Sequence, residues 1–330
     1  MKNKSIQARW PSTSQLIRWC GTLVSSLLFI WLVSRQNWSA TWTSLTSTPV
    51  WLIPLVFALY FSAMLLNSLR WDILLRSQGI LVPFVEVVKI VLTGAFASNF
   101  LPSTVGGDSV RVVSLLRYKA TWTLSLASVV LDRLLNVVAM VTVLPFSYLI
   151  FKSQGSNLPG ASLSGVIGRL LIISGKIPAV LVGFGFLGIR MEKWRLKISS
   201  WLRRLSDILR KWLNKPGALL AAFSFSWLSS FVVFLAVWAL ARGLEISISL
   251  FQVMGIMALT YLVSLLPISI NGYGVREVAV TTLYMQMGAT LEQASTLAVV
   301  TRFMLLIETL PGALWLSQSV TPKPRGEELL

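Results

Sequence analysis

The chain has 330 residues, of which 55% are apolar and only 12% are charged, with a mean hydropathy of +0.73. This composition excludes a disordered chain, a nucleic-acid-binding module and an ordinary cytosolic enzyme. Lys and Arg outnumber Asp and Glu by 29 to 12. Because these cations lie between apolar blocks, we expect them to face anionic lipid at the cytoplasmic side. The sequence has no His and one Cys, so a His–Asp triad, a zinc site and an internal disulfide are excluded, and no cofactor or metal is expected.

Apolar blocks of the length needed to span a membrane, about 20 residues, recur along the chain. We expect spans at roughly 19–34, 50–69, 121–151, 165–189, 217–241 and 291–318. Two further apolar blocks, near 83–100 and 248–266, run directly into stretches rich in Pro and Gly. The predicted fold class is therefore an all-α integral membrane protein with about six transmembrane helices and two re-entrant helical hairpins in two inverted repeats.

Charge placement gives the orientation of this topology. The stretch 190–215 holds nine cations against two acidic residues, which places it in the cytoplasm. A complete crossing at 83–100 would put that stretch outside, whereas a hairpin over 83–118 that opens to the cytoplasm keeps it inside. The same reasoning predicts a hairpin over 248–276 that opens to the outside. It also puts both termini in the cytoplasm, with Arg70 and Arg76 on the cytoplasmic side.

The predicted domain organisation follows from these elements. Residues 1–330 form a single transmembrane domain, and residues 1–151 are its first repeat. Residues 152–189 contain the fourth span, and 217–318 complete the second repeat. Between them, 190–215 reads as an amphipathic helix on the inner membrane surface, because Trp and Leu residues recur there at helical spacing with cations on the other face.

The two hairpin tips resemble each other in sequence. Residues 101–111 and 266–276 both read L-P-x4-G-x2-V-R, and the two motifs lie half the chain apart with five of 11 positions identical. A second pair, Arg133 and Arg302, follows at nearly the same separation. Together the two matches predict an internal repeat, and the charge-derived topology gives its halves opposite orientations, as in many secondary transporters.

The composition of the tips suggests anion binding. Proline breaks the helix and glycine permits close backbone approach, so free N–H groups at the following helix start can meet an anion. Arg111 and Arg276 close the two motifs and are candidates to hold a phosphate. The alternative is a plain helix break with both arginines at the interface. The other candidate substrate-binding residues share these tips: Asn99, Gly107, Asp108, Asn271, Gly272 and Glu277.

Two arginines fall deep inside predicted spans, where charges are costly and are paired or functional. Arg133 is expected to pair with Asp108 or Asp132, and Arg302 with Glu277 or Glu308. The candidate deep charged support of the site consists of Asp132, Arg133, Arg302 and Glu308.

Three motifs in order resemble those of the lysylphosphatidylglycerol synthase transmembrane family, also called flippase-like domain proteins. They are Asn99–Ser103 with Gly106, Gly107, Asp108 and Arg111, then Asp132-Arg133, then Pro267–Ser269 with Gly272, Gly274, Arg276 and Glu277. The resemblance covers nearly the whole chain. It implies that the chain corresponds to the membrane flippase half of the multiple peptide resistance factor. The lysyltransferase domain is not expected, because the stretch after the last predicted span is too short for it. Other relatives are linked to polyprenyl-lipid glycosylation.

The expected function is therefore lipid transport in the cytoplasmic membrane of a bacterium or archaeon, without enzyme activity. The cargo would be an anionic phospholipid or a polyprenyl phosphate, held between the two hairpins. Nucleic acid is not expected as a partner, whereas a second copy of the chain or a separate lipid-modifying enzyme is. The rival interpretations are a membrane enzyme acting on lipid-linked sugars, with Asp108 or Glu277 as acid or base, and a non-transporting accessory subunit.

Overall fold

The computed structural model describes residues 48–100, 104–153, 210–265 and 274–320, and every regular element in these ranges is helical. The longest helices are α3 (Leu52–Ser77), α6 (Trp122–Ser153), α9 (Pro216–Gly243) and α12 (Leu291–Thr309). Four shorter α-helices are α4 (Phe84–Phe100), α5 (Thr104–Leu115), α10 (Leu250–Ser264) and α11 (Val275–Gln286). The 3-10 turns η1 (Leu116–Tyr118) and η3 (Leu310–Gly312) follow α5 and α12, and α13 (Ala313–Val320) continues beyond η3.

Four helical segments in the described part are long and apolar enough to cross a membrane: α3, residues 122–145 of α6, α9, and the continuous stretch Leu291–Leu316. They match four of the six spans expected from the sequence, and their length and composition support a helical membrane protein. The second expected span ends later than predicted, because the helix continues from residue 69 to Ser77. The spans expected at 19–34 and 165–189 lie outside the described residues.

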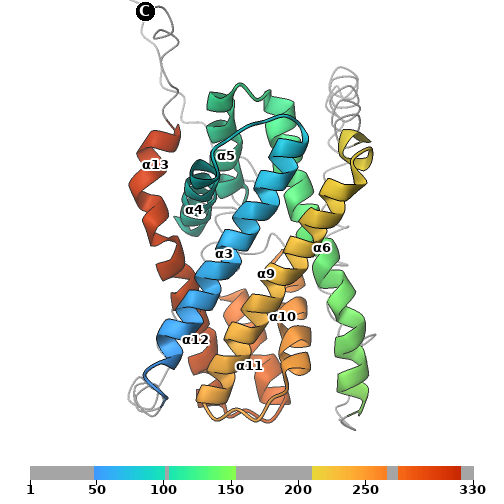
Figure 1. The fold of residues 1–330 in the computed structure, drawn as a ribbon. Coiled ribbons are helices and arrows are strands. Elements are labelled where there is room, and N and C mark those ends of the chain that lie inside the picture. The colour runs from blue at the N-terminus through green and yellow to red at the C-terminus, as the bar shows by residue number, and fades with distance from the viewer. Residues whose placement is uncertain (1–47, 101–103, 154–209, 266–273, 321–330) are drawn as a thin grey trace, which may run out of the picture.

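Each of the two regions in which a hairpin is predicted contains a pair of short helices. In the first, α4 is followed by α5, and in the second α10 is followed by α11. The second arm of the later pair extends to Gln286, well past the predicted end of the hairpin at residue 276. The two pairs lie at opposite ends of the helical bundle (Figure 1). The order of two short helices followed by a long helix thus occurs in both halves of the chain.

The core forms where α3 and α9 pack side by side and where the α10–α11 pair packs below them (Figure 1). Val56 of α3 and Phe234 of α9 are almost fully buried in this cluster. A Cβ at Gly243 would overlap the Leu52 side chain, so glycine permits the close contact between these two helices. This packing fixes the positions of the polar side chains that α3 and α9 direct into the interior, such as Asn67 and Ser229.

The amphipathic segment expected over 190–215 is described only from residue 210. Residues 210–213 are helical, and Trp212 is fully buried, with its indole N–H donating to the Leu74 carbonyl oxygen at 3.1 Å. In this last turn the Trp side chain therefore packs against α3 inside the protein. The rest of the predicted helix lies outside the described residues.

Candidate functional site

The first half of the chain builds a charged network around Asp132 of α6. The Asp132 side chain is 3% exposed and accepts from the Arg70 Nε at 2.7 Å. Both terminal nitrogens of Arg111, on α5, donate to its other oxygen at 3.0 Å. The Arg111 guanidinium also lies 4.1 Å from the ring centre of Trp71. Arg111 is therefore held on two sides, by a carboxylate and by an aromatic face.

A second pair in the same half joins α6 back to α5. Arg133 donates to the two Asp108 oxygens at 3.2 and 3.0 Å, in a fork arrangement. Of the two partners expected for Arg133, the structure selects Asp108, because Asp132 is already occupied by two other arginines. The Arg133 side chain is 42% exposed, whereas the Asp132 side chain is buried.

The second half repeats this pairing at the same chain separation. The Arg302 Nε, on α12, donates to Glu277 of α11 at 2.5 Å, and both this pair and the Arg133–Asp108 pair span 25 residues. Glu277 is fully buried and its other oxygen accepts the Gly274 N–H at 2.7 Å. Gly274 has φ +78°, so the turn into α11 requires glycine here. Of the two partners expected for Arg302, the structure supplies Glu277.

Arg276 differs from its repeat counterpart Arg111. Within the described residues its nearest carboxylate oxygen belongs to Glu277, at 3.9 Å from one terminal nitrogen, and that nitrogen is buried without a hydrogen-bond partner. The sequence explains the difference, because aligning Arg302 with Arg133 puts Thr301 where the first half has Asp132. Arg276 is therefore a largely buried guanidinium, 11% exposed, for which no described residue supplies the hydrogen-bonded counter-charge that Asp132 gives to Arg111.

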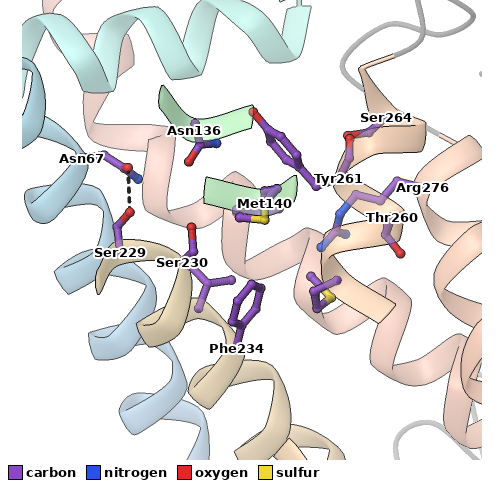
Figure 2. A pocket seen from close by; sticks show the side chains of 13 residues that line it. Asn67, Asn136, Met140, Ser229, Ser230, Phe234, Thr260, Tyr261, Ser264 and Arg276 are labelled. Carbon is purple, nitrogen blue, oxygen red and sulfur yellow. Dashed lines mark hydrogen bonds between the residues drawn. The ribbon is translucent and has the colours of Figure 1, made fainter. Parts of the chain in front are cut away.

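Two neighbouring cavities share two lining residues, Asn67 of α3 and Asn136 of α6; one is lined by first-half residues alone and the other by residues of both halves. The first, of about 180 Å³, is lined by the arginines and aspartates of the first-half network. The second, of about 200 Å³, is lined by Arg276, several hydroxyl side chains and apolar residues of α6, α9 and α10. Figure 2 shows Arg276 entering this second cavity from one side, while Asn67 and Ser229, joined by a 3.0 Å hydrogen bond, line the opposite side.

The other predicted tip residues have less uniform positions. Gly107 lies at a close crossing of α5 and α4, since an added Cβ would overlap Ser98 and Gly94. Asn99 turns toward α12, where its amide donates to the Thr309 hydroxyl at 3.0 Å. Glu308 is buried at 7% exposure and forms no hydrogen bond or ion pair with another described residue. Asn271 and Gly272 lie outside the described residues.

Several polar residues of the two cavities carry no signal in the sequence analysis. Arg70 is predicted at the cytoplasmic end of a span, yet it is 5% exposed and also donates to Asn136 and Ser226, at 3.3 and 3.1 Å. The sequence pattern misses it because the apolar block ends at residue 69 while the helix does not. Asn67 and Asn136 are single amides in apolar helices, and only their common place between the cavities identifies them.

Among the described residues there is no group of three or more His, Cys, Asp or Glu side chains that could hold a metal ion. The carboxylates of the site are instead bonded to arginines, with Asp108 and Asp132 in one half and Glu277 in the other. The arrangement is thus suited to binding an anion through Arg276.

Comparison with known proteins agrees with this architecture. A family model described as the lysylphosphatidylglycerol synthase TM region matches residues 18–312, and the chain belongs to this family of membrane proteins. The chain is also similar to a UPF0104 membrane protein from Pyrococcus horikoshii, with 30% identity over 100 residues. That match covers 29% of this chain and 30% of the relative.

Proposed function

We propose that this member of the lysylphosphatidylglycerol synthase TM family is a lipid transporter that moves an anionic phospholipid or a polyprenyl-phosphate lipid between the two leaflets of the membrane. The observation that carries the proposal is the Arg276 guanidinium, which lines a cavity between the two halves of the chain and has a buried nitrogen without a hydrogen-bond partner among the described residues. A guanidinium buried in a membrane protein is costly and marks a functional site. The neighbouring carboxylate of Glu277 lies 3.9 Å away and is bonded to Arg302, so a lipid phosphate would supply the hydrogen-bonded counter-charge that Arg276 lacks among the described residues.

The lipid head group would enter the paired cavities while its acyl chains remain in the bilayer. Arg276 would hold the phosphate as a two-pronged donor, and the donors of Asn136 and Tyr261, which line the same cavity, lie ready to assist. Arg111 would add positive potential without direct phosphate binding, because Asp132 occupies its terminal nitrogens. This differs from a symmetric clamp by both tip arginines, and it assigns the direct contact to the second half alone.

The membrane topology in this proposal uses the short helices as re-entrant hairpins. At 1.5 Å per residue, α4 is about 25 Å long and α5 about 18 Å long, against a hydrocarbon core of about 30 Å. Helices α10 and α11, with 15 and 12 residues, are similarly short. Because the two pairs lie at opposite ends of the bundle, each would open to a different side of the membrane (Figure 1).

Cysteine labelling tests this topology. In a Cys20→Ser background, Lys215→Cys should react with an impermeant reagent from the cytoplasmic side, and Glu245→Cys should react from the outside, because the two residues flank α9. Labelling of both positions from the same side would contradict the proposed orientation.

The transport test uses purified protein in liposomes with lipids labelled on the acyl chain. Wild-type protein should move labelled anionic lipid between leaflets and return it chemically unchanged, whereas a membrane enzyme would alter the lipid. Arg276→Gln should lose most of this transport. It should not lower the melting temperature, since Glu277 keeps its 2.5 Å bond to Arg302.

Arg76→Gln is the matched control, because the Arg76 side chain is 50% exposed and pairs with Asp72 near the end of α3, outside both cavities. It should transport lipid at the wild-type rate. If Arg276→Gln also transports lipid at that rate, a phosphate bound at Arg276 is not part of the mechanism.

A further inference from the structure

The hydrogen-bonding groups around the Arg276 cavity specify more than a phosphate. Three hydroxyl groups in its wall have already donated their protons to carbonyl oxygens of their own helices. They are Ser230 to Ser226 at 2.8 Å, Thr260 to Ile256 at 2.7 Å, and Ser264 to Tyr261 at 2.7 Å. A hydroxyl whose proton is used in this way keeps its lone pairs as acceptors. These oxygens can therefore accept hydrogen bonds from donors of a ligand.

Donors face the same cavity from other positions. The Asn136 side-chain oxygen accepts from Arg70 at 3.3 Å, and its amide nitrogen makes no hydrogen bond within the described residues. The Tyr261 hydroxyl is buried and likewise has no partner among them. Figure 2 shows Tyr261 extending from its own helix toward Asn136. Neutral donors and neutral acceptors thus line one space, which matches groups that both donate and accept, as hydroxyls do.

A positively charged head group finds no available counter-charge in the described part of this space. None of the described residues that line the Arg276 cavity is Asp or Glu. In the adjoining cavity, Asp108 is bonded twice by Arg133, and Asp132 is bonded by Arg70 and Arg111. An ammonium group placed here would lose its hydration without gaining a carboxylate partner, and it would be repelled by the positive charge of Arg276.

We propose that the cavity selects a lipid whose phosphate carries an uncharged hydroxylated group, such as a glycerol or a sugar, and that it rejects head groups bearing an ammonium, including a lysyl group. This inference rests on the proposed lipid-transport function and narrows its cargo. The proposed cargo therefore differs from lysylphosphatidylglycerol, the lipid named in the description of the family. The described residues of the cavity wall do not include the carboxylate that a lysyl group requires.

Liposome transport and melting curves in detergent test the proposal together. The probes are phosphatidylglycerol, lysylphosphatidylglycerol, phosphatidylethanolamine and phosphatidic acid, each with the same labelled acyl chain. Phosphatidylglycerol should move at least about tenfold faster than the two amino lipids, since a polar site rejects ligands that leave its groups unpaired. It should also raise the melting temperature of the solubilised protein, whereas the amino lipids should not.

Thr260→Val provides the matched variant, because it keeps the side-chain shape and removes one acceptor without touching Arg276. It should slow phosphatidylglycerol transport about three- to tenfold, the factor for one lost hydrogen bond between neutral groups. It should leave phosphatidic acid transport unchanged, because that lipid has no group beyond its phosphate. An equal loss for both lipids would overturn the proposed role of the hydroxyl groups.

The remaining outcomes distinguish this inference from the proposed function. Equal transport of all four lipids would overturn the head-group selectivity and leave lipid transport intact. Selective stabilisation by phosphatidylglycerol without transport would support the selectivity and overturn the transporter. Stabilisation by lysylphosphatidylglycerol equal to that by phosphatidylglycerol would overturn the selectivity by itself.

Discussion

Asp132→Asn tests whether the first-half network is an integral part of the fold. The Asp132 carboxylate is 3% exposed and accepts three hydrogen bonds from two arginines, at 2.7, 3.0 and 3.0 Å. The substitution keeps the side-chain volume and removes the charge, so two buried guanidinium groups lose their common counter-charge. Breaking a buried ion pair from one side costs about 3–5 kcal/mol. At about 2 °C per kcal/mol for a chain of this size, the melting temperature should fall by about 6–10 °C.

The assay is thermal unfolding of purified protein in detergent, followed by tryptophan fluorescence. Glu86→Gln is the control, because Glu86 pairs with Lys89 at a partly exposed position and such pairs contribute about 0.3–0.5 kcal/mol. The double variant Asp132→Asn with Arg111→Gln should melt higher than Asp132→Asn alone, since it removes one of the stranded charges. If Asp132→Asn melts within about 2 °C of the wild type, the network does not stabilise the fold.

Three further substitutions test the second half and the helix crossings. Glu277→Gln should lower the melting temperature by several degrees, because it breaks a fully buried ion pair with Arg302. Glu308→Gln removes a buried carboxylate with no hydrogen bond to another described residue, so it should leave the melting temperature unchanged or raise it. Equal losses for the two variants would contradict the pairing of Arg302 with Glu277. Gly107→Ala should destabilise the protein by about 1–3 kcal/mol through overlap with α4, while Gly217→Ala, with open space around its Cβ, should not; melting curves compare them. Thr301→Asp gives the second half the carboxylate that Asp132 supplies in the first half. It should reduce lipid transport in liposomes without unfolding the protein. Transport at the wild-type rate would contradict the idea that Arg276 binds an anion because it has no hydrogen-bonded carboxylate of its own.

The sequence predicted the four described spans and limited the partners of each deep arginine to two carboxylates. Apolar blocks of about 20 residues correspond to α3, α6, α9 and the α12–α13 stretch, because burial in lipid requires that length and composition. Each deep arginine was expected to choose between two carboxylates, and the choices found are Asp108 and Glu277. The candidates were few because a membrane span tolerates few charges.

The composition of the cavities was beyond the reach of sequence patterns. Arg70 lies after the apolar block, where a cation is ordinarily interfacial, and only the continued helix turns it toward Asp132. The amides of Asn67 and Asn136 gain meaning from the crossing of α3 and α6, which no local pattern encodes. Trp212 similarly fits a membrane-surface pattern, yet its indole is fixed by the Leu74 carbonyl group inside the protein.

The difference between the two halves suggests how duplicated elements divide their tasks. If neither Arg111 nor Arg276 had a hydrogen-bonded carboxylate, the empty protein would contain two desolvated guanidinium groups. Each such group lowers the free energy of unfolding. Asp132 removes this cost in the first half by holding Arg111, and the two resulting bonds tie α5 rigidly to α6. The second half has Thr301 at the position of Asp132, so no carboxylate at that position holds Arg276. An anion that binds Arg276 therefore lowers the free energy of the second half, whereas Arg111 already has its counter-charge. In the proposed transporter, the first half therefore serves as a fixed wall of the cavity, and the affinity for the head-group phosphate resides in the second.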